Sequence, residues 1–120
     1  MKKIAFVVQR YGLEVNGGAE MECRMYAERL TDRYEVHVLT SRAIDYITWK
    51  NEYAAGEEML NGVHVHRFSV AHPRVPADFD AINGRFLQGF LEPDEEEQWV
   101  EEQGPYLPEL INYLKAHEAE

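Results

Sequence analysis

The feature that most limits what this chain can fold into is the order strand, glycine-rich loop, helix, strand near its start. Residues 3–9 are a nearly continuous apolar run, which predicts a strand covered on both faces and hence a parallel sheet. Glycines interrupt residues 10–18, and apolar side chains three or four positions apart predict a helix over 19–32. Residues 34–40 alternate and include β-branched side chains, so they predict a second strand at the pitch of a βαβ unit.

The later residues continue the alternation of strands and helices. Asn61 and Gly62 form a turn signal ahead of a third predicted strand at 63–70. Three more helices are predicted, over residues 77–91, 94–103 and 106–117. The sequence therefore predicts an α/β fold, a Rossmann-like parallel sheet with flanking helices, in one partial domain over 1–120. Because three strands make a thin sheet and no strand follows the last helix, we expect the front part of a larger domain.

Composition and charge argue against a nucleic-acid partner. The 120 residues carry 12 basic and 22 acidic side chains, and 45% are hydrophobic, which indicates one folded domain rather than a disordered chain. Residues 51–120 hold 4 basic and 15 acidic side chains, a net charge of −11. We therefore expect no nucleic acid partner, because binding to nucleic acid depends on basic surfaces that neutralise phosphates.

Neither a membrane span nor a secretion signal is expected. No apolar run approaches the ~20 residues of a membrane-spanning helix, and the run at 4–8 is shorter than the roughly 7–15 apolar residues of a signal peptide. We therefore expect no transmembrane segment and a cytoplasmic protein. Cys23, the single cysteine, cannot form an internal disulfide, and its apolar helix neighbours indicate a buried, unreactive thiol.

The loop segment Asn16-Gly17-Gly18-Ala19-Glu20 lies between the first predicted strand and the first predicted helix. A helix start presents unpaired N–H groups and a partial positive charge, and glycine lets a phosphate oxygen approach the backbone. Ligands of open α/β sheets bind outside the carboxyl ends of the strands, where this loop is expected. The segment therefore predicts an anion site. The alternative is that the glycines only turn the chain and cap the helix.

Familiar phosphate-binding and hydrolase motifs are absent from the sequence. The glycines do not form G-x-G-x-x-G, and Thr40-Ser41-Arg42 stands where a ribose-binding acid would follow the second strand, which argues against a nicotinamide site. There is no G-x-x-x-x-G-K-[ST] and no G-x-S-x-G, so neither an NTPase P-loop nor a hydrolase elbow is present.

Four consecutive segments carry a resemblance to a known family. They are the run from Lys3 to Gly12, the loop from Asn16 to Glu20, the helix end Ala27-Glu28-Arg29-Leu30, and the strand at 34–40. In this order they resemble the N-terminal start of family 4 glycosyltransferases, which are retaining enzymes of GT-B architecture. The resemblance extends more weakly through Asn61-Gly62-Val63 and Arg67 to the last predicted helix.

The resemblance implies two Rossmann-like domains that face a cleft. The C-terminal domain mainly holds a nucleoside diphosphate sugar, and the N-terminal domain binds a carbohydrate or lipid-linked acceptor. In that arrangement Gly17, Gly18, Ala19 and Glu20 approach the donor diphosphate and sugar, and the sugar is transferred with retention. The sequence stops before the donor-binding half, so no catalytic residue is assigned, no cofactor is expected, and this chain alone is expected to be inactive.

Side chains near the carboxyl ends of the first two predicted strands are candidates for the acceptor side. They are Arg10, Asn16 and Arg42, together with Tyr46 and Trp49 in the long connection over 41–61. Arginine suits phosphate or carboxylate groups, and aromatic rings with polar neighbours suit an acceptor sugar. The alternatives are solvated arginines and aromatic rings that pack over the edge of the sheet.

No metal site is expected. His64 and His66 lie on one face of the third predicted strand and His37 on the second. Three imidazoles could hold zinc, but polar alternation on an edge strand explains the pattern equally well. Seven carboxylates between residues 92 and 102 are interpreted as a solvated helix face, because they lack the spacing of a calcium-binding loop.

A second functional hypothesis stays open at this point. The chain is then a non-catalytic binding or assembly module on a half-Rossmann scaffold. In either case an unpaired strand edge and the apolar face of the last predicted helix favour self-association, so we expect a homo-oligomer.

Overall fold

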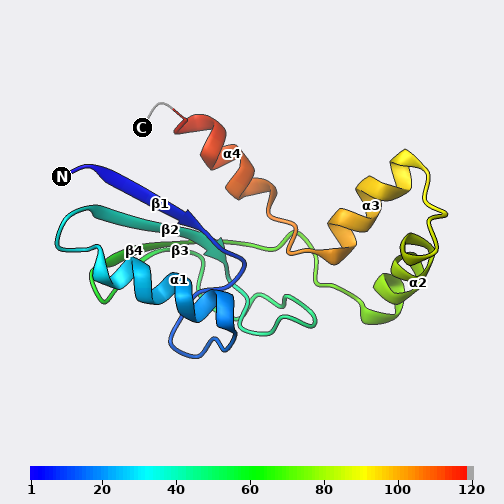
Figure 1. Cartoon of the computed structure of the whole chain (residues 1–120), viewed down its shortest axis with the longest axis horizontal. Helices are drawn as coiled ribbons and strands as arrows, with labels where there is room; N and C mark the ends of the chain where they lie inside the picture. Colours follow the sequence, from blue (N-terminus) through cyan, green and yellow to red (C-terminus); the bar gives the residue numbers. More distant parts are fainter. Residues whose placement is uncertain (119–120) are drawn as a thin grey trace.

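The computed structural model describes residues 1–118. The elements in chain order are β1 (Lys3–Val7), α1 (Gly18–Arg29), β2 (Glu35–Ser41), β3 (Gly56–Leu60), β4 (Val63–Phe68), α2 (Pro76–Leu87), α3 (Pro93–Gln103) and α4 (Pro108–Ala116). Figure 1 shows the strands and α1 at one end of the molecule, with α2 and α3 extending from the sheet and α4 returning toward it. Each predicted strand and helix is present, with ends that differ by a few residues.

The strands form one mixed, mostly parallel sheet in the order β1-β2-β4-β3. β1, β2 and β4 are parallel, and β3 is antiparallel to β4. The α/β class is confirmed and the three predicted strands are parallel, but the sheet has a fourth, unpredicted strand, β3, which is antiparallel. This strand is largely exposed and includes two adjacent glutamates, so it has no apolar alternation that would have indicated a strand.

A tight turn joins β3 to β4. Asn61 has φ 51° and Gly62 has φ 83°, the left-handed values that a two-residue hairpin turn requires at both of its central positions. Leu60 pairs with Val63 across the turn. The predicted turn is confirmed, and its geometry sends β3 back along β4 in the antiparallel direction.

The two faces of the sheet are covered unequally. Ala27 of α1 packs in a core with the inward valines of β2 and β4, and Figure 1 shows α4 above the strands and α1 below them. On the α4 side, Val7 of β1 is 59% exposed. The prediction that the first strand is covered on both faces is therefore wrong. The run is apolar because one face of β1 packs against the core. α4 covers only part of the other face of this edge strand.

A second core cluster joins the sheet to the helical part of the chain. Ala43, Trp49 and Val70 are buried together, and Leu107 packs against them. The Trp49 indole Nε1 donates a hydrogen bond to the backbone oxygen of Gln103 at 2.9 Å. This contact holds the end of α3 against the connection that follows β2.

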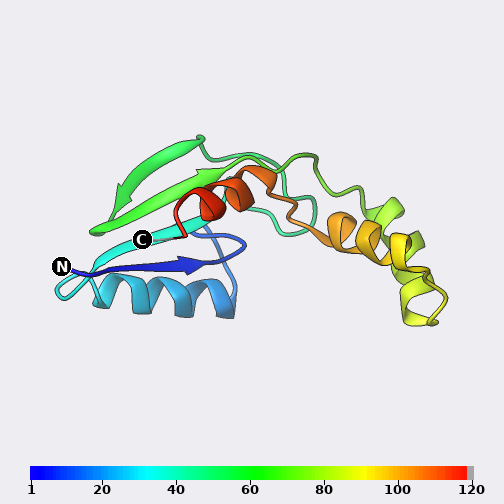
Figure 2. The same ribbon diagram turned by 90° about the horizontal axis from the view of Figure 1, so that it is seen from above.

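α2 and α3 form a helical arm that protrudes from the sheet (Figures 1 and 2). Phe86 of α2 stacks on Trp99 of α3 with ring centroids 4.3 Å apart. α2 ends at Leu87, before the predicted end at 91, and Gly89 beyond it takes φ 77°. Acidic residues supply a capping box at the start of α3, so part of the acidic stretch serves as a helix-start signal.

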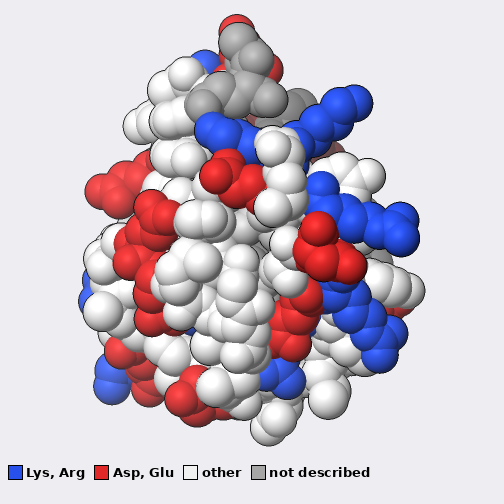
Figure 3. All heavy atoms as spheres, turned by 90° about the vertical axis from the view of Figure 1, so that its left-hand side faces the viewer, with Lys and Arg blue, Asp and Glu red and all other residues white. Residues whose placement is uncertain are grey.

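Charged side chains of both signs are interspersed with uncharged surface at the end of the molecule where β1, β2 and β4 begin (Figure 3). The opposite end of the sheet is the one at which open α/β sheets bind ligands.

Within residues 1–118, none of the helices combines the length and the hydropathy that crossing a bilayer requires.

Cys23 lies on α1 and is half-buried against the core beneath that helix. Burial raises the pKa of its thiol, and the thiolate is the reactive form. We therefore expect DTNB at neutral pH to modify Cys23 at least several-fold more slowly in the native protein than in guanidinium chloride. Equal rates in the two conditions would contradict this prediction.

Candidate functional site

The glycine-rich loop lies at the carboxyl ends of the parallel strands. β1 ends at Val7, and α1 begins at Gly18 with Gly17 as its N-cap. Because β1, β2 and β4 are parallel, the chain leaves all three strands at the same edge of the sheet (Figure 1). The predicted position of the loop, at the carboxyl ends of the parallel strands, is confirmed.

A nearly buried ion pair holds this loop to the start of α1. Arg10 Nη2 lies 3.0 Å from Glu20 Oε1, and the two side chains are 7% and 12% exposed. The same guanidinium donates hydrogen bonds to the backbone oxygens of Asn16 at 2.6 Å and Ile44 at 2.9 Å. Arg10 thereby connects the end of β1, the loop before α1 and the loop after β2. The negative charge of Glu20 neutralises the positive charge of Arg10, so the pair adds no net charge to the site.

Gly17 is required by this ion pair. It has φ 139°, and a Cβ there would lie 2.2 Å from Glu20 Oε2 and 2.9 Å from Arg10 Nη2. Gly18 differs, because a Cβ on it would meet no atom within 4 Å. Gly18 and Ala19 are exposed, and no side chain in the described part of the chain caps the start of α1. The first N–H groups of α1 therefore lie at the surface, at the positive end of the helix dipole.

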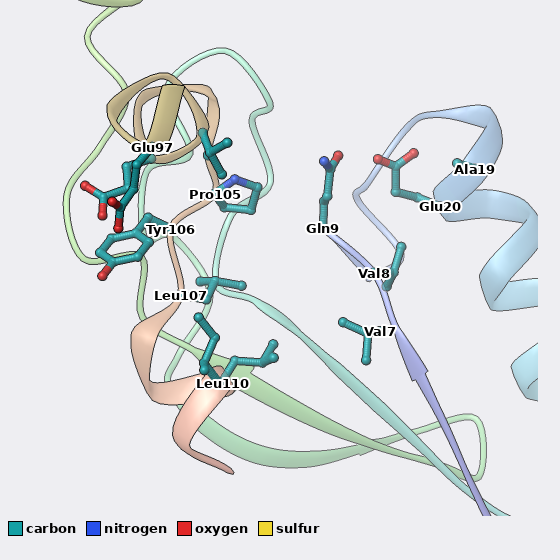
Figure 4. A pocket seen from close by; sticks show the side chains of 14 residues that line it. Val7, Val8, Gln9, Ala19, Glu20, Glu97, Pro105, Tyr106, Leu107 and Leu110 are labelled. Atoms are coloured by element: carbon teal, nitrogen blue, oxygen red, sulfur yellow. The ribbon is translucent and has the colours of Figure 1, made fainter. Parts of the chain in front are cut away.

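A groove of about 750 Å³ opens beside this helix start. Its apolar floor is formed by Val7 and Val8 at the end of β1 and by Leu107 and Leu110 at the start of α4. Figure 4 shows β1 and the start of α1 on one side, and the connection between α3 and α4 on the other. The groove is thus built from two segments that are far apart in the sequence, residues 7–20 and residues 97–111.

The polar groups that line the groove are mostly acidic. Glu20, Glu97 and Glu101 line it, and no lysine or arginine of residues 1–118 does. Such a groove disfavours a free anion, whereas a sugar can donate hydroxyl hydrogens to the carboxylates and place its C–H groups on the apolar floor. The N–H groups at the start of α1 suit an anion, whereas the carboxylates and the apolar floor of the groove, which Ala19 also lines, suit a neutral, hydroxyl-bearing group.

The predicted acceptor-side residues fall into two groups. Arg10 and Asn16 lie at the start of α1, and the exposed ring of Tyr46 has its centre 5.3 Å from the Arg10 guanidinium carbon. Arg42 instead donates hydrogen bonds to a backbone oxygen and to a serine hydroxyl, and Trp49 is only 3% exposed. The structure thus brings Arg10, Asn16 and Tyr46 together and commits Arg42 and Trp49 to internal contacts. A ligand role for any of them stays a prediction.

Sequence reasoning missed a cluster beside the same loop. The guanidinium of Arg67 is buried, lies 3.8 Å from the centre of the Tyr53 ring and forms an ion pair of 3.1 Å with Glu58. The Tyr53 hydroxyl donates to Glu14, and burial raises the pKa of Tyr53 to about 12. A Cβ at Gly12 would collide with the Tyr53 hydroxyl. From the sequence, Gly12 was expected only to interrupt secondary structure. Its lack of a side chain could also have indicated that another side chain passes close to the backbone here.

Comparison of the chain with protein-family models, with curated proteins and with solved structures finds no match. Three features of the chain therefore bear on its function: the open start of α1, the groove beside it and the order of the sequence segments that lead to it.

Proposed function

We propose that this chain forms the N-terminal, acceptor-side portion of a retaining glycosyltransferase of Rossmann-like, GT-B architecture. In the proposal the start of α1 binds the diphosphate and sugar of a nucleoside diphosphate sugar. The observation that carries it is the uncapped, exposed helix start at Gly18 and Ala19, at the carboxyl edge of a mostly parallel sheet. The order of segments over residues 3–40, which resembles family 4 glycosyltransferases, supports it.

In this proposal the chain binds and orients the reactants. The N–H groups of Gly18 and Ala19 donate to diphosphate oxygens, where negative charge develops as the sugar departs. The carboxylates of Glu20, Glu97 and Glu101 accept hydrogen bonds from hydroxyls of a carbohydrate or lipid-linked acceptor in the groove. The remaining donor contacts belong to a second domain, so this chain alone is expected to show no turnover.

The proposal is tested by adding a panel of nucleoside diphosphate hexoses to the nitrogen-15-labelled chain and following its amide resonances. Because in this proposal most of the donor contacts come from a second domain, we expect weak binding, with a Kd in the millimolar range, about −4 kcal/mol. The largest shifts should belong to Gly17, Gly18 and Ala19, and the matching nucleosides without phosphate should leave those resonances unchanged. Shifts confined to other residues, or none at saturating donor, would contradict the proposal.

Replacing Gly18 by alanine tests the approach of the ligand to the backbone. The added methyl group has open space around it, and Gly→Ala in a helix reduces the entropy of the unfolded chain, so thermal stability should stay equal or rise. Donor binding should weaken several-fold, because the methyl group stands where an oxygen would approach the N–H groups. Gly84→Ala, in α2, is the matched control, since its Cβ also meets no atom within 4 Å. Equal donor affinity in the two variants would sink the assignment of this loop.

One observation favours the alternative, an assembly module. Within residues 1–118, β1 is hydrogen-bonded on one side only, to β2, and Val7 on this edge is 59% exposed. Ile111 and Leu114 of α4 are also exposed, and Ile111 lines the same groove as Val7. A bare strand edge beside apolar surface is a surface on which a second chain can pair.

We expect this surface to make the isolated chain a dimer or larger species at high micromolar concentration. Sedimentation velocity measures it directly, and Ile111→Glu should shift the distribution toward monomer because it places a charge on the apolar surface. Met21→Glu, at an exposed apolar position of α1, is the control and should leave the distribution unchanged. A monomer at every concentration would refute the expectation.

A further inference from the structure

The sheet face opposite α1 gathers three histidines. His37 of β2 lies directly across the parallel pairing from His64 of β4, and His66 follows two residues later on the same face. The ring of His37 stacks on both others, with centroids 4.6 Å from His64 and 5.1 Å from His66. The sequence alone left open that His64 and His66 lie on an edge strand. β4 is not an edge strand, because it lies between β2 and β3.

A carboxylate completes a set of possible ligands. Glu35, His37 and His64 each offer one ligand atom, and these atoms all lie within 4.8 Å of one another. In a tetrahedral site with bonds of about 2.0–2.1 Å, neighbouring ligand atoms are roughly 3.4 Å apart. His37 Nε2 and Glu35 Oε2 already face each other at 3.1 Å. Small side-chain rotations therefore suffice to bring all three ligand atoms around one ion.

Each histidine of this set is oriented by a second partner. His64 Nδ1 is 3.0 Å from Glu57 Oε1, and His37 Nδ1 is 2.8 Å from His66 Nε2. If each Nδ1 carries the proton, each Nε2 presents its lone pair to an ion. A hydrogen bond from the distal ring nitrogen to a carboxylate or another acceptor is the usual support of a metal-bound histidine.

The proposed ligands lie beside a cavity and are open to solvent. The cavity, of about 230 Å³, lies between the sheet and α4, and of the three ligands His37 lines it. The Glu35, His37 and His64 side chains are 40%, 19% and 29% exposed, so an ion can enter from solvent. Lys3 Nζ lies 3.9 Å from Glu35 Oε2 and is half exposed, so a cation that binds Glu35 displaces this lysine toward solvent.

We propose that Glu35, His37 and His64 bind a zinc ion, with Glu57 and His66 as the positioning residues. Two imidazoles and one carboxylate suit zinc rather than magnesium or calcium, which prefer oxygen ligands alone. Three protein ligands leave the fourth position for water or for a group from a binding partner. The ion would link β2 to β4 under α4, on the face of the sheet opposite α1.

Isothermal titration of the tag-free, chelator-treated chain with zinc chloride tests the proposal. We expect one equivalent of zinc per chain with a Kd in the micromolar range or below. His37→Gln and His64→Gln should each weaken binding at least a hundredfold, and Glu57→Gln about 10–100-fold through the loss of its support. His72→Gln, an exposed histidine outside the cluster, is the matched control and should bind as the parent chain does.

Two further measurements keep the result interpretable. Far-ultraviolet circular dichroism should show the fold unchanged in the glutamine variants, because all the replaced side chains are at least partly exposed. Cobalt substituted for zinc should give the visible absorption of a tetrahedral site in the parent chain and lose it in His64→Gln. Zinc affinity that is unchanged in folded His37→Gln and His64→Gln, or no uptake at 100 µM zinc, would overturn the proposal.

Discussion

Replacing Trp49 by alanine is expected to lower the free energy of unfolding by about 3–5 kcal/mol, the usual cost of removing a large buried aromatic ring. Trp49 is 3% exposed, and its ring packs with Ala43, Val70 and Leu107. The substitution also removes the indole donor to the backbone oxygen of Gln103. A loss of this size is a large fraction of the roughly 5–15 kcal/mol that stabilises a small domain.

Urea unfolding followed by circular dichroism measures this loss. Trp49→Phe is the informative companion, because it keeps most of the buried area and removes the hydrogen bond, which is worth about 1 kcal/mol. Trp99 then remains as the fluorescent reporter of the helical arm. We expect its emission to shift to the red in Trp49→Ala, since the end of α3 loses its anchor to the sheet. A decrease below about 1 kcal/mol for the alanine variant would show that this cluster does not join arm and sheet.

The strand, loop, helix and strand at the start of the chain were predictable because their signals are local. The apolar run at 3–9, the glycines before α1 and the spacing of its apolar residues each specify an element without reference to distant residues. β3 has no such signal. It exists because a hairpin turn returns it along β4, and because Glu57 and Glu58 meet His64 and Arg67 there.

The candidate site was predictable in position but not in chemistry. Glycines between a strand and a helix indicated where the start of α1 would lie, whereas the pairing of Arg10 with Glu20 depends on how the loop folds between them. The far side of the groove comes from residues near 97–111, and its place depends on the contact of Trp49 with Gln103. No periodicity reports a contact between residues 54 positions apart. The sequence places His64 and His66 on one face of a strand, but the stacking of His37 on both rings depends on which strand neighbours β4.

Arg10→Met is expected to destabilise the chain by about 3–5 kcal/mol, because removing one partner of a buried ion pair leaves the other charge uncompensated. Glu20 would keep a carboxylate that is only 12% exposed, and the backbone oxygens of Asn16 and Ile44 would lose their donor. The loop would then lose the contact that fixes Gly17. Both the urea midpoint and the amide resonances of the loop should change.

The double variant Arg10→Met/Glu20→Met separates the ion pair from other effects of the substitution. It removes both charges, so it should be more stable than the sum of the two single losses predicts, by about 0.5–3 kcal/mol. Arg85→Met is the matched control, because Arg85 pairs with Glu95 at the surface, where an ion pair is worth about 0–1 kcal/mol. Additive losses at positions 10 and 20 would mean that the guanidinium acts mainly through the carbonyls of Asn16 and Ile44. The backbone at Gly17 would then be held by those hydrogen bonds, and the start of α1 would stay open even without Glu20.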